Sequence, residues 1–121
     1  MSEIGPLRRG SIVQVSFDPA IGSEAAKSRP AVIVSNNGAN AAAARVVGGL
    51  VTVVPITSNT ARVHPFQVFI PAEASGLRLD SKAQAEQVRT ISTARVQRFL
   101  GRLPAELLAE LDEALRIHLA L

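Results

Sequence analysis

Arg29 stands where a polar loop meets an apolar segment, a position from which a charged side chain can be aimed at a ligand. Residues 20–28 are rich in Gly, Ser, Ala and charge, whereas residues 30–35 form a short apolar run suited to a buried strand. Pro30 restricts the residue before it to an extended backbone, so the strand behind it can hold Arg29 in place. A guanidinium there could bind phosphate oxygens through two parallel hydrogen bonds. The alternative is a surface Arg paired with Glu24.

Three hydrogen-bonding side chains in a row, Thr57, Ser58 and Asn59, come at the end of the most β-like segment, residues 50–57. Their hydroxyl and amide groups could hold a phosphodiester. The alternative is an ordinary turn, because Ser, Thr and Asn also bind their own backbone in turns. The residue types alone leave both interpretations open.

The other titratable groups form no recognised metal-binding or cofactor-binding pattern. Either histidine could carry a proton near neutral pH, but His64 lies in an expected loop and His118 near the apolar face of an expected helix. The carboxylates are scattered, the chain has no cysteine, and its glycines match no nucleotide-binding motif. We therefore expect neither a metal ion nor a cofactor.

Composition indicates one domain over residues 1–121, with an aliphatic core and a basic body. The chain has a mass of 12.7 kDa, is 47% hydrophobic and contains 11 Arg but only 2 Lys. An Arg-rich surface suits a phosphate-bearing partner, and the acidic groups concentrate in the last helix. No signal peptide or membrane-spanning run is apparent, so we expect a cytoplasmic protein with no membrane contact.

The elements that must position these residues are short strands followed by one helix. Alternation predicts a strand over residues 11–17, and apolar runs predict further strands, with Pro55 suggesting an edge or a bulge. An amphipathic helix is predicted from Pro104 onward, with Leu119 on its apolar face. The fold class is mainly β, an antiparallel barrel or sandwich with a C-terminal helix. The remaining expected elements are strands at 30–35, 50–57, 63–70 and 82–91, and a helical turn or two at 39–45.

Five segments together resemble the MazF/PemK family of toxin endoribonucleases. In chain order they read RRGSIVQVSFDPAIGSEAAKSRPAVIVSNN, VVPITSN, HPFQV, DSKAQAEQVRTI and the Leu-rich last helix. The match covers nearly the whole chain at the family's usual spacings. The resemblance implies an SH3-like, partly open antiparallel barrel with a C-terminal amphipathic helix, assembled as a homodimer with an RNA groove that spans both subunits.

The resemblance also implies an activity and residues that carry it. The family cuts single-stranded RNA at short specific sequences without a metal, leaves a 2',3'-cyclic phosphate and a 5'-hydroxyl, and is neutralised by a partner antitoxin. The family's essential Arg matches Arg29, and its Thr after the third strand matches Thr57. Ser23 and Glu24 match a loop that lines the RNA groove, and Gln87 matches a position near the RNA.

Four further positions are expected to contact RNA from the same resemblance. Ser58 and Asn59 follow the matched Thr, Phe17 replaces the Trp or Tyr that family members often have near the end of the first strand, and His64 replaces a frequent Tyr. Arg29 would stabilise the charge of the phosphorane and could protonate the leaving oxygen, since a guanidinium stays protonated at neutral pH.

Glu24, His64, water and Arg29 itself remain open as the general base. The antitoxin is expected to bring an acidic, partly disordered segment. The alternatives to an endoribonuclease are a DNA gyrase poison of the related fold and a non-catalytic RNA-binding barrel.

Overall fold

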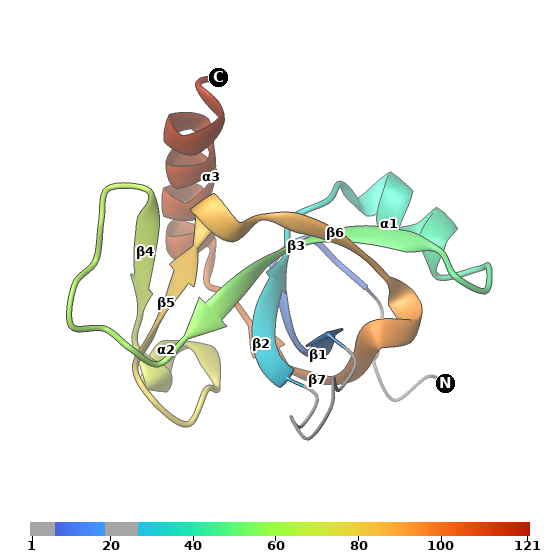
Figure 1. Cartoon of the computed structure of the whole chain (residues 1–121), viewed down its shortest axis with the longest axis horizontal. Coiled ribbons are helices and arrows are strands. Elements are labelled where there is room, and N and C mark those ends of the chain that lie inside the picture. The colour runs from blue at the N-terminus through green and yellow to red at the C-terminus, as the bar shows by residue number, and fades with distance from the viewer. Residues whose placement is uncertain (1–6, 19–26) are drawn as a thin grey trace.

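The computed structural model describes residues 7–18 and 27–121 as a strongly curved sheet with a helix at one end (Figure 1). That helix, α3, contacts the strand β4. The strands are β1 (Ser11–Asp18), β2 (Lys27–Ile33), β3 (Leu50–Thr57), β4 (Gln67–Ile70), β5 (Ser81–Gln84), β6 (Arg89–Ser92) and β7 (Val96–Arg102), and the helices are α1 (Asn37–Ala43), α2 (Ala72–Ser75), α3 (Ala105–Leu119) and the 3-10 helices η1 (Ala85–Gln87) and η2 (Thr93–Arg95).

Every strand pairing in the described part of the chain is antiparallel. The strand order is β4-β5-β3-β2-β1-β7, and β6 also pairs with β3. Within residues 7–18 and 27–121 the end strands β4 and β7 do not pair with each other, so the sheet does not close. The expected fold class, a mainly β, partly open antiparallel barrel with a C-terminal helix, is confirmed.

The central strand β3 changes partner at Pro55. Its first half pairs with β6 up to Val53, and its second half pairs with β5 from Ile56 onward. Pro55 lies between these two ladders and faces Ala31 of β2. Proline has no amide hydrogen to donate to a neighbouring strand, and this loss matters least where one ladder ends and the next begins. The expectation of an edge strand or a bulge at Pro55 was wrong, because a junction between two ladders meets the same requirement.

Alternate residues of the strands belong to two different apolar clusters. Val13, Val15 and Phe17 of β1 belong to the first cluster, whereas Ile12 belongs to the second. This is the side-chain alternation of a sheet that is covered on both faces. The second cluster is closed by α3 through Leu111, which is fully buried. The helix therefore fixes the half of the barrel that carries β4 and β5.

The last turn of α3 differs from the prediction. Leu119 and His118 are exposed, although the first was placed on the apolar face and the second beside it. Figure 1 shows the reason, since this end of α3 projects beyond the sheet. Pro104 is the N-cap of the helix, so α3 begins at Ala105, one residue after the expected start.

The strand predictions held where one pattern ran without interruption. The segments 11–17 and 50–57 are β1 and β3, and the helical turn over 39–45 is α1, capped by the Asn36 side chain, which accepts from the Ala39 amide at 2.8 Å. The segment 82–91 is instead two strands separated by η1, and only the second half of 63–70 is a strand. β7 was missed because its exposure does not alternate.

Candidate functional site

Arg29 and Thr57 lie just beyond one end of the ladder between β2 and β3. That ladder pairs residues 31–33 with residues 53–55, and its register, continued by two residues, would oppose Arg29 to Thr57. Opposed residues of an antiparallel pair share one face of the sheet. The last two residues of β3 pair with β5 instead, so the ends of β2 and β3 border a cavity.

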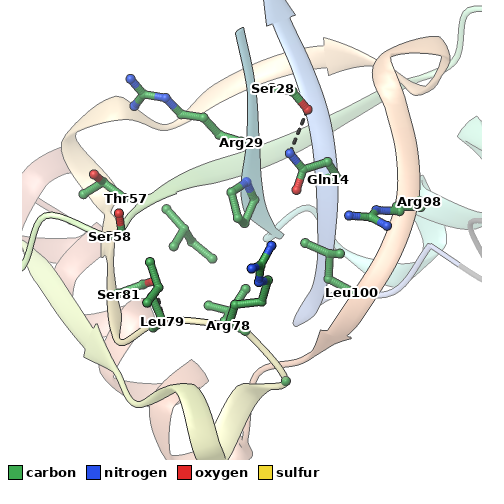
Figure 2. Close-up of a pocket in the computed structure, with 14 residues that line it drawn as sticks. Gln14, Ser28, Arg29, Thr57, Ser58, Arg78, Leu79, Ser81, Arg98 and Leu100 are labelled. Atoms are coloured by element: carbon green, nitrogen blue, oxygen red, sulfur yellow. Dashed lines mark hydrogen bonds between the residues drawn. The ribbon is translucent and has the colours of Figure 1, made fainter.

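This cavity has a volume of about 400 Å³, which is within the range of small-ligand sites. One wall comes from β1, β2 and β7, and the other from the end of β3 and the segment that leads into β5 (Figure 2). Both Arg29 and Thr57 line it, as expected if they hold one phosphate between them. The lining residues are Gln14, Ser28, Arg29, Pro30, Ile56, Thr57, Ser58, Gly76, Leu77, Arg78, Leu79, Ser81, Arg98 and Leu100.

The Thr57 hydroxyl is oriented by the turn that follows it. Its Oγ1 accepts a hydrogen bond from the backbone amide of Asn59 at 3.3 Å, and Asn59 Oδ1 accepts one from the Ala61 amide at 3.2 Å. The turn interpretation of this segment is therefore correct. It does not conflict with a binding role, because an accepting hydroxyl keeps its own proton to donate to a phosphate oxygen.

Arg29 is half-buried at the start of β2, beside a side-chain network that joins three strands. Gln14 Nε2 of β1 donates to Ser28 Oγ at 2.7 Å, and Ser28 Oγ donates to Gln97 Oε1 of β7 at 2.7 Å. This network fixes the backbone next to Arg29. Within the described part of the chain, the Arg29 guanidinium has no hydrogen bond or ion pair, and Glu24, its partner in the alternative interpretation, lies outside the described residues.

The second wall is held in place by a close approach of two glycines. Gly76 ends α2 in a left-handed conformation with φ 83°, and a Cβ on Gly101 of β7 would lie 2.2 Å from the Ser75 carbonyl oxygen. Asp80 Oδ1 also accepts from the Ala72 amide at 2.9 Å. These contacts hold the segment between α2 and β5 against β7 and across the cavity.

That segment and β7 bring two further arginines to the cavity, Arg78 and Arg98, which the sequence analysis missed. Nothing in the sequence distinguishes them from the other exposed arginines, because their neighbours at the site come from distant parts of the chain. No Asp or Glu is among the described lining residues. The cavity therefore carries a concentration of positive charge that its own walls do not neutralise.

Of the other expected RNA-contacting residues, Ser58 lines the cavity, whereas Asn59, His64 and Gln87 do not. The His64 ring stacks on Phe66 with 5.1 Å between ring centroids. Gln87 lies exposed on η1. The structure of one chain thus brings together Arg29, Thr57 and Ser58, and leaves the other three outside this cavity.

Phe17 is in a different environment from the one expected. Its ring is only 5% exposed and belongs to the first apolar cluster, and Arg89 Cζ lies 5.1 Å from its centroid. A base can stack only on a ring face that it can reach. An RNA base therefore cannot stack on this ring in this conformation, because the ring is buried in the core and the Arg89 guanidinium lies over it.

Ser23 and Glu24 lie outside the described residues. Among the residues that are described, no three His, Cys, Asp or Glu side chains lie together as a metal site would require. No helix in the described part of the chain is long and apolar enough to cross a membrane.

Comparison with family models matches the PemK-like, MazF-like toxin of type II toxin-antitoxin system over residues 8–119. Among curated proteins, the chain is 58% identical to Endoribonuclease MazF9 of Mycobacterium tuberculosis over 115 residues, which are 95% of this chain and 98% of the relative. It is 31% identical to Endoribonuclease EndoA of Bacillus subtilis over 116 residues, 95% of this chain and 96% of the relative.

Solved structures give the same result for the fold. MazF of Deinococcus radiodurans superposes with a TM-score of 0.73 at 29% identity, covering 94% of this chain and 96% of the other. A MazE-MazF structure from the same organism gives a TM-score of 0.74 at 28% identity, again over 94% of this chain and 96% of the other.

Proposed function

This chain belongs to the family of PemK-like, MazF-like toxins of type II toxin-antitoxin systems, and on that premise we propose that it is an endoribonuclease that cuts single-stranded RNA. The observation that carries the proposal is that Arg29, at the start of β2, and Thr57, at the end of β3, line one cavity. The names of relatives that match nearly the full length of the chain support it. We take residues 1–121 as one toxin domain.

The reaction that fits these groups is an intramolecular transesterification at the phosphorus of an RNA phosphodiester. The 2'-oxygen forms a bond to phosphorus while the bond from phosphorus to the 5'-oxygen breaks, which leaves a 2',3'-cyclic phosphate and a 5'-hydroxyl. The Arg29 guanidinium stabilises the extra negative charge on the phosphoryl oxygens and donates a proton to the departing 5'-oxygen. The Thr57 hydroxyl donates to another oxygen of the same phosphate and keeps it in line.

The proton of the 2'-hydroxyl must leave as that oxygen attacks. No carboxylate or imidazole is present among the described lining residues. The proton acceptor is therefore solvent water or Glu24, which lies outside the described residues. No step of this mechanism requires a metal ion, and we propose that the activity is metal-independent. Without a tuned acid-base pair, the chemical step should be slow.

We propose in addition that the protein acts in the cytoplasm as a homodimer and is neutralised by an antitoxin. The MazE-MazF structures among its structural neighbours support the antitoxin partner. The basic body of the chain, with 11 Arg in total, suits an acidic, partly disordered segment of such a partner.

The test is incubation of the purified protein with a long single-stranded transcript, with and without EDTA, followed by sequencing of the 5'-hydroxyl ends. We expect cleavage at a short recurrent sequence, equal in both conditions. Binding without cleavage would indicate an RNA-binding barrel, and inhibition of DNA gyrase supercoiling without RNA cleavage would indicate a gyrase poison. Loss of cleavage in EDTA would restore a metal mechanism.

A further inference from the structure

Arg78 and Arg98 line the same cavity as Arg29 but are separate from the Arg29–Thr57 pair. In Figure 2 the Arg98 guanidinium is directed toward the cavity from β7, and Arg78 extends from the segment before β5 toward β2, whereas the Arg29 guanidinium points away from both. The cavity therefore has positive charge in two places. One of them, beside Thr57, is assigned to the phosphate that is cut.

Neither Arg78 nor Arg98 has an ion-pair partner in the part of the chain that the structure describes. The salt bridges found there are Arg9 with Asp112 and Arg116 with Glu113, and none of these four residues lines the cavity. Two guanidiniums facing one cavity repel each other, and nothing described in the lining offsets that repulsion. The arrangement becomes favourable when an anion lies between them.

The backbone on both sides of this pair is fixed before any ligand binds. The register of β1 against β7 shifts on each side of the pairs that contain Phe99 and Arg98, and such bulges re-aim side chains. Gln97, next to Arg98, accepts the hydrogen bond from Ser28. Arg78 lies on the segment that the close approach of Gly76 and Gly101 presses against β7. The two side chains thus start from two anchored and neighbouring backbones.

Part of the cavity lining is apolar, and we call it the apolar floor. Pro30, Ile56 and Leu100 contribute to it, and Leu77 and Leu79 flank Arg78. A nucleotide combines an anionic phosphate with a flat base and a ribose, which bury well on such a floor. About 400 Å³ gives room for a group of that kind.

We propose that Arg78 and Arg98 form a second phosphate-binding subsite, which holds the RNA phosphate adjacent to the scissile one while the intervening nucleotide lies on the apolar floor. The proposal rests on the proposed function, since it assigns the Arg29–Thr57 pair to the cleaved phosphate. The subsite contributes to binding and to the placement of the strand, and the reacting bonds form and break at Arg29.

The test uses a fluorescein-labelled, fully 2'-O-methylated 12-nucleotide RNA of mixed sequence, which cannot be cleaved because it has no free 2'-hydroxyl. Its Kd is measured at several salt concentrations between 50 and 200 mM. Each phosphate contact on a single strand contributes about 0.7 to the slope of log Kd against log salt. Arg78 and Arg98 share one phosphate, so the double variant Arg78→Ala/Arg98→Ala should lower the slope by about 0.7. Over the fourfold salt range the wild-type Kd should rise about 2.6 times as much as that of the variant.

The matched control is Arg102→Ala. Arg102 is exposed on the same strand β7, four residues beyond Arg98, but it does not line the cavity. Its removal should leave the slope as in wild type. All variants should show the wild-type circular dichroism spectrum and Tm within about 2 °C, because exposed side chains without intramolecular partners contribute little to stability.

Cleavage kinetics separate this subsite from the reacting centre. The double variant should raise KM and lower kcat far less than Arg29→Ala does. A double variant with the wild-type salt slope, in a protein that cleaves RNA, would overturn the subsite and leave the proposed function intact. Wild-type protein that shows the expected slope difference but cleaves no RNA would overturn the endoribonuclease assignment and leave the subsite as a binding site.

Discussion

Replacing Gly101 by Ala tests whether the contact between β7 and the end of α2 shapes the cavity. The added Cβ would lie 2.2 Å from the Ser75 carbonyl oxygen, whereas ordinary contact begins at 3.4 Å, so one backbone must move by about 1 Å. Overpacking of this kind costs about 1–3 kcal/mol, which lowers Tm by about 4–12 °C in a chain of this size. The segment that carries Arg78 would move away from β7.

The expected result for Gly101→Ala is therefore a lower Tm together with weaker RNA binding. A charge-assisted hydrogen bond from Arg78 contributes about 1.5 kcal/mol to the binding free energy, and moving Arg78 by this distance should remove at least half of that contribution. The Kd of the 2'-O-methylated RNA should therefore rise at least about threefold. Differential scanning calorimetry gives the stability, and fluorescence anisotropy at fixed salt gives the Kd.

Gly49→Ala is the matched control, because the chain offers a second glycine in the same situation. A Cβ on Gly49 would lie 2.2 Å from the Ala43 carbonyl oxygen, at the junction of α1 and β3 and away from the cavity lining. It should lower Tm to a similar extent and leave the Kd unchanged. The reasoning is refuted if both variants weaken binding equally, or if Gly101→Ala loses stability and binds RNA as tightly as wild type.

Substitutions at three other positions have outcomes that follow from single contacts. Thr57→Val keeps the shape and removes the hydroxyl, so kcat should fall by about tenfold to a hundredfold in a single-turnover assay, and Thr57→Ser should retain most of it. Asn40 is fully buried, and its Nδ2 donates to the Ser35 carbonyl oxygen at 2.8 Å while its Oδ1 accepts from the Ser35 hydroxyl. Asn40→Ala should therefore lower the free energy of unfolding, measured by urea denaturation, by about 2–4 kcal/mol. Phe17→Leu should cost less than about 1.5 kcal/mol and leave RNA affinity unchanged, because the ring serves the core; a loss of affinity in a folded variant would restore the base contact.

The parts of the fold that were predictable depend on local pattern. β1 and β3 were located because their apolar residues alternate or run without interruption between clear breakers. β7 could not be located, since bulges at two points break its period of two and its exposure follows neither face. The 3-10 helix η1 was hidden inside the strand predicted over residues 82–91, because a three-residue turn leaves no periodic signal.

The residues of the candidate site likewise include some that could be predicted from the sequence and some that could not. Arg29 and Thr57 were found from residue type, from the restriction that Pro30 imposes and from the family resemblance, and both line one cavity beyond the end of the β2–β3 ladder. Arg78 and Arg98 depend on contacts between segments far apart in sequence, namely α2 against β7 and β2 against β7. No local rule predicts such contacts, so only the folded chain distinguishes these two arginines from the other exposed ones.

The central claim is that the Arg29 guanidinium stabilises the transition state at a phosphate that Thr57 also holds. Single-turnover cleavage of a transcript by wild type and by Arg29→Ala tests it most directly, with the melting temperature of both proteins as the check on folding. We expect kcat to fall by at least about a hundredfold, the usual effect of removing one positioned donor. A folded Arg29→Ala protein that cleaves at close to the wild-type rate would contradict the account.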